Sequence, residues 1–295
     1  RGMSAYVSHP ITIGHEVAAE VVEVGDNVYG IKPGMIVTGN PYFNCGTCYS
    51  CRRGMVNCCV RNETMGVQRE GAFSDYLTMP VGRLYDGQGI DPKELALIEP
   101  FCISCHGVSR ASVKPGDKVL VFGAGAIGIL AGVAAKSVGA RVYITDIAGE
   151  KVEAAVRDFH LDGGFVNESR ERLDAFVQEI TDGDGFDVTV EAVGAPSTFL
   201  GCVQAAASRG RAVVIGVAKH SADFNFLELQ RKELDMYGSR AATAADFAAA
   251  MKLVKDGFVD LKKLISRTYP AGSAAEAFRD LNQNYGEIIK AEFEF

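Results

Sequence analysis

The chain has little of what membrane proteins and nucleic-acid-binding proteins need. No apolar run approaches the roughly 18 to 20 residues of a bilayer-spanning helix, and the charged, mixed first segment has no signal-peptide core. No Lys-rich or Arg-rich run is present, and the net charge is -7, from 37 acidic against 30 basic residues. We therefore expect neither a membrane nor a nucleic-acid partner, and we expect a cytoplasmic protein.

Internal repeats and low-complexity linkers are also absent, so we expect the parts of the chain to pack closely. With 295 residues, 47% of them hydrophobic and 23% charged, the chain can form one large domain or two ordinary ones. It contains 8 cysteines. In a reducing compartment these are expected as metal ligands or buried thiols rather than as disulfides.

The pattern of apolar residues divides the chain into three parts. Residues 11 to 85 carry short runs rich in Val, Ile, Gly and Thr, broken by turn residues, which predicts the short strands of a barrel-like β unit. Between residues 113 and 238, short apolar runs alternate with Ala-rich helical segments, which is typical of a parallel sheet covered on both faces. The part from residue 239 has helical patterning and ends in a strand-like stretch.

One short loop carries cysteines at the spacing C-x2-C-x2-C-x7-C, namely Cys45, Cys48, Cys51 and Cys59. Four thiolates can enclose a zinc ion in a tetrahedral shell without an open position, so this zinc would be structural. A metal-free surface cluster and an iron-sulfur site are the alternatives. Cys58 could replace its neighbour Cys59, but adjacent side chains of an extended loop point apart, so only one of the two should bind.

The stretch VLVFGAGAIG contains a G-x-G-x-x-G motif between a strand-like and a helix-like run. Such glycines let the backbone approach a pyrophosphate at a helix N-terminus. A second strand-like run ends at Asp146, whose carboxylate can accept hydrogen bonds from a ribose 2'-hydroxyl. Because an anion repels a 2'-phosphate, NAD is favoured over NADP. The alternative is a doubly wound domain with an empty crevice.

The expected cofactor-binding residues are those of this motif, the acidic residue after it and the ends of two later strand-like runs. The later segments are the expected neighbours of the ribose and nicotinamide, although strand termination explains any single residue of them equally well. The full set is Gly123, Gly125, Ala126, Ile127, Gly128, Asp146, Val193, Gly194, Ile215, Gly216 and Val217.

Two other patterns contain histidine. His15 and Glu16 lie between a glycine and a strand-like run, and either could bind a metal ion; a solvated surface pair is the alternative. Cys102, Cys105 and His106 spell C-x-x-C-H, the signature of a c-type haem, and C-x-x-C alone can be a redox dithiol. The acidic, leaderless context disfavours a haem. The expected fold, which is not thioredoxin-like, disfavours a redox dithiol. We expect the two cysteines to share one face of a helix and to pack as small apolar residues.

Taken in order, GHE, the four-cysteine loop, G-x-G-x-x-G and the Asp at the end of the second strand resemble the zinc-dependent medium-chain alcohol and polyol dehydrogenases. The resemblance runs from about Pro10 to Phe295. The segments GIDPKELALIEPF, NCC and GSRAAT are most similar to the L-galactonate or L-gulonate 5-dehydrogenase branch.

The resemblance implies an α/β fold with a GroES-like β-barrel catalytic domain and a Rossmann domain with a doubly wound parallel sheet. The expected boundaries are 1–108 for the first part of the catalytic domain, 109–238 for the Rossmann NAD-binding domain and 239–295 for the return to the catalytic domain. The resemblance also implies that the protein forms a homodimer or a homotetramer.

The resemblance further implies a catalytic zinc held by His15, Glu16 and Glu99, with the direct role of Glu16 or Glu99 left open. A remaining cysteine ligand would lie before Arg1, so we expect a preceding segment to be missing and the printed chain to be a poor enzyme. The implied reaction moves a hydride between NAD and a secondary alcohol of a polyol or sugar acid, with zinc lowering the pKa of the alcohol hydroxyl.

Arg240 is the basic residue nominated for a substrate carboxylate, because a guanidinium can bind that group through two hydrogen bonds. A cofactor-phosphate contact and an interface ion pair are its alternatives. For the whole chain, the alternatives are a threonine or simple-alcohol dehydrogenase, a zinc-free quinone reductase that uses NADPH, and an NAD-binding protein that has lost catalysis.

Overall fold

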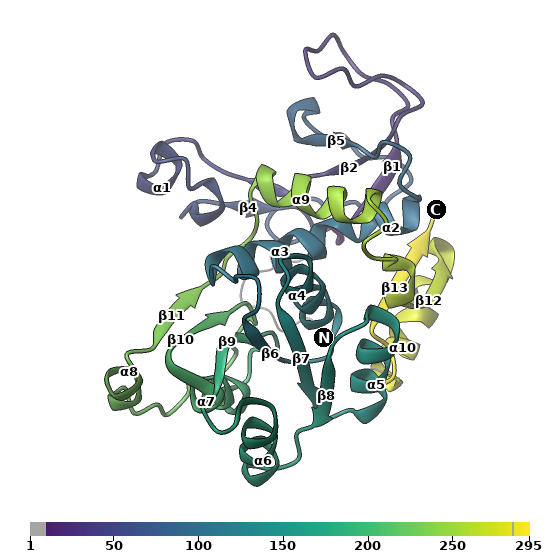
Figure 1. The fold of residues 1–295 in the computed structure, drawn as a ribbon. Helices are drawn as coiled ribbons and strands as arrows, with labels where there is room; N and C mark the ends of the chain where they lie inside the picture. Colours follow the sequence, from purple (N-terminus) through teal and green to yellow (C-terminus); the bar gives the residue numbers. More distant parts are fainter. Residues whose placement is uncertain (1–9, 285) are drawn as a thin grey trace. The chain divides into compact units, whose positions relative to one another are not determined.

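The structure is a computed structural model that describes residues 10–284 and 286–295. The chain divides into two compact units (Figure 1). Of the described residues, unit 1 contains residues 10–102 together with Ala241–Asn282 and Ala291–Phe295. Unit 2 contains Ile103–Arg240 and Gln283–Lys290. Among the described residues, no helix is long and apolar enough to cross a membrane.

Unit 2 is built on a six-stranded sheet whose strand order is β11-β10-β9-β6-β7-β8. Every strand pairs in parallel with its neighbours. The order reverses between β6 and β9, which is the topological switch point where doubly wound sheets bind ligands. The strands are β6 (Lys118–Phe122), β7 (Arg141–Asp146), β8 (Gly163–Val166), β9 (Phe186–Glu191), β10 (Ala206–Val214) and β11 (Asp235–Gly238).

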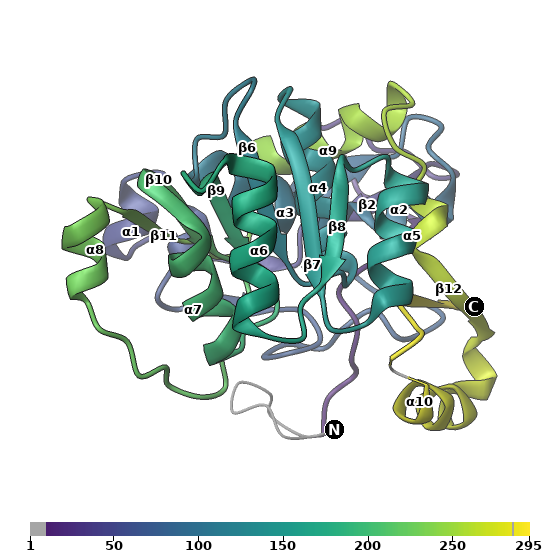
Figure 2. The ribbon, with the colours of Figure 1, turned by 60° about the horizontal axis from the view of Figure 1, so that its bottom comes forward.

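Helices cover both faces of this sheet, with α6 and α7 over one face and α4 over the other (Figure 2). Successive side chains of β6 point to opposite faces of the sheet, which explains the two layers. Leu120 and Phe122 pack in the core cluster with residues of α6 and α7, whereas Val121 lies next to Gly128 of α4. The helices of unit 2 are α4 (Ala126–Ser137), α5 (Gly149–Phe159), α6 (Arg170–Thr181), α7 (Pro196–Ala205) and α8 (Leu227–Lys232). The residues of α3 (Ile98–Arg110) belong to unit 1 up to Cys102 and to unit 2 from Ile103.

Unit 1 has small sheets of short strands. One sheet has the order β1-β2-β5, another pairs β3 with β4, and a third pairs β12 with β13. The strands are β1 (Ala18–Glu20), β2 (Ile36–Gly39), β3 (Tyr42–Phe43), β4 (Glu63–Thr64), β5 (Leu84–Asp86), β12 (Ile265–Pro270) and β13 (Lys290–Glu294). The helices are α1 (Tyr49–Arg52), α2 (Pro92–Ala96), α9 (Ala244–Lys255) and α10 (Ala274–Gln283).

Aromatic contacts join early and late segments of the chain within unit 1. The ring of Phe73 meets those of Phe293 and Phe295 edge-on, at centroid distances of 4.9 and 5.0 Å. Tyr85 of β5 stacks on Phe247 of α9 at 4.9 Å. Such pairs add to the burial of apolar area. The last part of the chain therefore completes the core of unit 1.

The predicted α/β fold with a doubly wound parallel sheet is confirmed. The second strand of that sheet ends at Asp146, where the apolar pattern predicted its end. The expected domain boundaries after residues 108 and 238 stay predictions.

Candidate metal and cofactor sites

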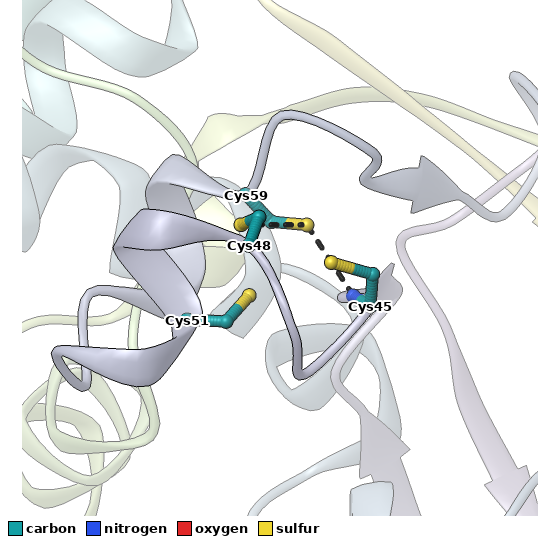
Figure 3. Close-up of side chains that lie close together, drawn as sticks. All are labelled: Cys45, Cys48, Cys51 and Cys59. Carbon is teal, nitrogen blue, oxygen red and sulfur yellow. Dashed lines mark hydrogen bonds between the residues drawn. The ribbon is translucent and has the colours of Figure 1, made fainter.

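The four cysteines of the C-x2-C-x2-C-x7-C loop, Cys45, Cys48, Cys51 and Cys59, lie together in unit 1. Their sulfur atoms are all within 4.8 Å of one another, and Figure 3 shows them turned toward a common centre. The sulfurs of Cys48 and Cys59 are 3.9 Å apart, close to the roughly 3.8 Å edge of a tetrahedron with 2.3 Å zinc-sulfur bonds. Cys58 is exposed and lies outside this cluster. The donor set and spacing fit a closed tetrahedral zinc shell.

The protonation of these thiols also favours a cation among them. The backbone hydrogen bond from Thr47, helped by the guanidinium of Arg61, lowers the pKa of Cys45 to about 5. A backbone hydrogen bond from Cys51 lowers the pKa of Cys48. Burial and the neighbouring thiols Cys48 and Cys59 raise the pKa of Cys51 to about 12. The first ionised thiols therefore oppose the loss of further protons, and a divalent cation would remove that repulsion.

Arg61 supports the cluster from outside and was missed by the sequence analysis. Its Nη2 donates to the hydroxyl of Thr47 at 2.6 Å and to the sulfur of Cys45 at 3.4 Å. Its backbone N–H donates to the sulfur of Cys59 at 3.4 Å. Hydrogen bonds of this kind orient metal ligands.

A second cluster in unit 1 contains His15, Glu16 and Glu99, whose possible ligand atoms all lie within 4.8 Å of one another. His15 and Glu16 precede β1, and Glu99 is in the first turn of α3. Glu99 is only 3% exposed. A set of one nitrogen and two carboxylate groups fits a catalytic zinc, because such sites have three protein ligands and an open position. The structure thus brings together the three predicted residues, and direct ligation stays a prediction.

Tyr42 belongs to this second cluster, although no sequence pattern indicated it. Its hydroxyl donates a hydrogen bond to Oε1 of Glu99. Burial, and then the charge of Glu99, raise the pKa of the phenol well above its usual value. The hydroxyl therefore remains a hydrogen-bond donor at neutral pH. Two more contacts fix the pair: Arg83 donates to the backbone oxygen of Tyr42, and the thiol of Cys102 donates to that of Glu99.

The segment before His15 is held by a second loop. The backbone N–H of Gly71 donates to the oxygen of Thr12 at 2.8 Å, and a Cβ added at Gly71 would lie 2.3 Å from the oxygen of Ile13. The carboxylate of Glu70 accepts from the N–H of Thr12 at 2.7 Å. The hydroxyl and N–H of Thr12 lower the pKa of Glu70. Only glycine permits this close approach of two backbones.

The glycine motif of unit 2 shapes a place for a pyrophosphate. Gly123 has φ of +108°, and a Cβ on Gly128 would lie 1.8 Å from the oxygen of Gly123. Gly125 is the N-cap of α4 and offers no side-chain cap. A Cβ at Gly125 would meet no heavy atom within 4 Å, so the space before the helix is open. The first N–H groups of a helix have no partner within the helix, so a helix N-terminus with open space before it fits a phosphate group.

Asp146 ends β7 and holds the glycine loop. Its Oδ2 accepts from the N–H of Ala124 at 2.7 Å and its Oδ1 from the N–H of Ala148 at 3.0 Å. Each carboxylate oxygen has more than one acceptor direction, so a ribose hydroxyl can still bind. The next residue, Ile147, is 83% exposed and gives an apolar surface beside this carboxylate. No sequence pattern indicated Ile147.

The two remaining predicted cofactor segments lie against each other. A Cβ on Gly194 would lie 2.4 Å from the backbone oxygen of Val217. Both segments meet the carboxylate of Glu191: it accepts from the N–H groups of Val193 and Gly194, and a Cβ on Gly216 would lie 2.4 Å from its Oε2. Glu191 was not predicted, because a Glu at a strand end has no distinctive spacing.

The other predicted residues are placed as follows. Arg240 is exposed and follows β11. Cys102 and Cys105 are buried on α3, as the helical spacing predicted for apolar packing. The cysteine expected before Arg1 lies outside the described residues.

The chain matches two family models and many known proteins. The alcohol dehydrogenase GroES-like domain matches residues 1–88, and the zinc-binding dehydrogenase model matches residues 126–256. L-galactonate-5-dehydrogenase of Escherichia coli K12 is 35% identical over 294 residues, which cover 100% of this chain and 86% of the relative. 2-dehydro-3-deoxy-L-galactonate 5-dehydrogenase of Pseudoalteromonas atlantica is 34% identical over 283 residues, with coverages of 96% and 82%.

A solved structure agrees with these matches. The crystal structure of a protein from Escherichia coli CFT073, described as a short chain alcohol dehydrogenase complexed with NADH, has a TM-score of 0.89 and 26% identity. The match covers 98% of this chain and 85% of that one.

Proposed function

The chain belongs to the zinc-dependent medium-chain alcohol and polyol dehydrogenases, and on that premise we propose that it oxidises a secondary alcohol of a sugar acid or polyol with NAD. The observation that carries the proposal is the cluster of His15, Glu16 and Glu99. The chain also has a glycine motif that leaves open space for a dinucleotide before α4. The cluster with His15 supplies a site for metal-assisted chemistry, and the glycine motif supplies a site for a hydride acceptor.

The proposed roles follow the donor atoms. His15, Glu16 and Glu99 hold a catalytic zinc, and the four cysteines of the loop hold a structural zinc. When bound, the catalytic zinc supplies Lewis-acid chemistry that lowers the pKa of an alcohol hydroxyl, and NAD supplies the hydride acceptor. Tyr42 keeps the carboxylate of Glu99 in one orientation, because its hydroxyl donates to Oε1.

The choice of NAD rests on Asp146 at the end of β7. Its carboxylate can accept from a ribose 2'-hydroxyl and would repel a 2'-phosphate. We expect Asp146→Asn to reduce the preference for NAD over NADP by about 10-fold or more, since the charge is removed while one acceptor oxygen is kept. The ratio of the dissociation constants for NAD and NADP measures this, and an unchanged ratio contradicts the assignment.

The choice of a sugar acid rests on two relatives that are named for L-galactonate and for 2-dehydro-3-deoxy-L-galactonate. Arg240 is the residue we assign to a substrate carboxylate. Arg240→Ala is expected to weaken turnover of aldonates more than of alditols. Equal losses for the two classes point instead to a contact with the cofactor or with another subunit.

The function is tested by NAD reduction in the presence of sugar acids, alditols, threonine and simple alcohols, together with zinc analysis. The proposal expects the intact protein to be active with a sugar acid or alditol and to hold two zinc ions per subunit. Activity confined to threonine or to simple alcohols would assign another specificity within the family. NAD binding without turnover, with a single zinc per chain, would identify a binding protein that has lost catalysis. We further propose a homodimer or homotetramer, which sedimentation analysis can test.

A further inference from the structure

Glu191 closes β9 with a carboxylate that is almost completely buried, at 1% exposure. Its Oε1 accepts from the N–H groups of Val193 at 3.0 Å and Gly194 at 2.9 Å, and from the hydroxyl of Thr198 at 2.6 Å. Its Oε2 also accepts from the N–H of Gly194, at 3.1 Å. Both oxygens are therefore acceptors.

This carboxylate is held by peptide N–H groups and one hydroxyl. Among the ion pairs found in residues 10–284 and 286–295, none includes Glu191. The N–H groups of Val193 and Gly194 can only donate, so both oxygens of Glu191 act as acceptors, whereas the hydroxyl of Thr198 is within reach of both Glu191 and the backbone oxygen of Ala195. The charge is also felt by Cys202, whose thiol pKa is raised first by burial and then by Glu191. Peptide and hydroxyl dipoles stabilise the charge but do not cancel it.

Glu191 lies at the switch point of the sheet, because it ends β9 beside β6. The N–H of Ala192 donates to the oxygen of Phe122 at 3.0 Å. A Cβ added at Gly123 would lie 2.7 Å from Cγ2 of Val193. The charge therefore lies next to the glycine loop, at the edge of the sheet where doubly wound folds bind dinucleotides.

The oxidised and reduced cofactors differ in charge at one place. Both contain the same adenosine, riboses and pyrophosphate, whereas the nicotinamide ring is cationic in NAD⁺ and uncharged in NADH. A fixed negative charge near the ring favours the cationic form. Hydrogen bonds that only shape the loop affect both forms alike.

We propose that Glu191 is a positioning residue that orders the Val193-Gly194 loop and whose buried charge makes the site prefer the oxidised nicotinamide ring. The inference rests on the proposed function and deepens it, because it assigns to one residue the balance between oxidised and reduced cofactor. It requires no direct contact between Glu191 and the ring.

Calorimetric titration of the whole chain with NAD⁺ and with NADH tests the proposal. Glu191→Gln keeps the size of the side chain and removes the charge, so the ratio of the dissociation constant for NAD⁺ to that for NADH should rise on the order of tenfold. Glu191→Asp keeps the charge but shortens the reach, and Thr198→Val removes one hydrogen bond. Each of these two variants should raise the dissociation constants for NAD⁺ and NADH by the same factor.

Two results would overturn the inference: an unchanged ratio in Glu191→Gln, or an equal change of the ratio in Glu191→Asp. Binding of both cofactors with an unchanged ratio leaves the proposed function standing. Failure of the unmodified protein to bind either cofactor overturns the proposed function as well.

A measurement on the unmodified protein covers the case in which Glu191→Gln loses its cooperative thermal unfolding. A dinucleotide with a benzamide ring in place of nicotinamide has a flat aromatic ring without the positive charge. The unmodified protein should bind NAD⁺ about tenfold more tightly than this analogue. Equal affinities would show that the site does not sense the charge of the ring.

Discussion

The hydroxyl of Tyr42 donates a hydrogen bond to Oε1 of Glu99, and both residues are buried. One oxygen of the carboxylate is thus held by a phenol that stays protonated at neutral pH, since burial and the nearby charge raise its pKa. A buried carboxylate held in this way keeps its orientation toward His15 and Glu16 when no metal is bound.

Tyr42→Phe is expected to weaken zinc binding at the catalytic site by about 10- to 100-fold, because an outer hydrogen bond to a metal ligand is lost. Competition with a chelator measures the affinity, and the spectrum of the cobalt-substituted protein reports the geometry. Tyr85→Phe is the matched control, since Tyr85 stacks on Phe247 in the same unit. Equal zinc affinity in the two variants would show that Tyr42 has only a packing role.

Cys51→Ser is expected to lower the zinc content by one ion per chain and to reduce thermal stability, because a closed structural shell contributes directly to folding. Cys58→Ser is the control, since Cys58 is exposed and lies outside the cluster. Elemental analysis and thermal unfolding follow the two effects. If Cys58→Ser also removes a zinc ion, the assignment of ligands in the loop is wrong.

Two glycine variants separate folding from cofactor binding. Gly128→Ala should destabilise the protein, because its Cβ would lie 1.8 Å from the oxygen of Gly123. Gly125→Ala meets no neighbour within 4 Å, so its thermal stability should stay close to that of the parent. Its dissociation constant for NAD should nevertheless rise on the order of tenfold, since the methyl group occupies the phosphate side of the loop. Unchanged binding by Gly125→Ala would argue against a pyrophosphate there.

The pH dependence of stability should include a contribution from Glu70. Because the hydrogen bonds from Thr12 lower its pKa below the ordinary 4.5, this carboxylate stabilises the folded state above that value. The contribution is lost as the pH falls through the lowered pKa. Glu70→Gln should therefore flatten the decline in unfolding free energy below about pH 4.5, measured by urea titration. Glu20→Gln, at an exposed position of β1, should leave the slope unchanged.

The sequence predicted those features that depend on local spacing. Alternating apolar runs located the strands of the parallel sheet, because each strand is buried on both faces. The four cysteines occupy 15 consecutive positions, so a short loop is sufficient to gather them. His15, Glu16 and Glu99 were grouped through the family resemblance, since more than 80 residues separate the pair from Glu99.

Tyr42, Arg61 and Glu191 were missed because their roles arise from contacts that no local pattern encodes. Tyr42 and Glu99 are 57 residues apart in sequence, and a Tyr in a short apolar run usually indicates packing alone. Glu191 reads as an ordinary strand end until the loop after β9 folds back on its carboxylate. The energetic cost of burying a charge is visible only once burial itself is known.

The contact of Phe73 with Phe293 and Phe295 has a consequence for how the protein is made. The ribosome releases Ile103–Arg240, the main body of unit 2, as an uninterrupted segment, so its sheet can form while synthesis continues. The loop that holds the segment before His15 gains its aromatic partners only when Phe293 and Phe295 emerge. The metal centre is therefore expected to mature after these two residues have left the ribosome, and a nascent chain stalled before them should bind dinucleotide before it retains catalytic zinc.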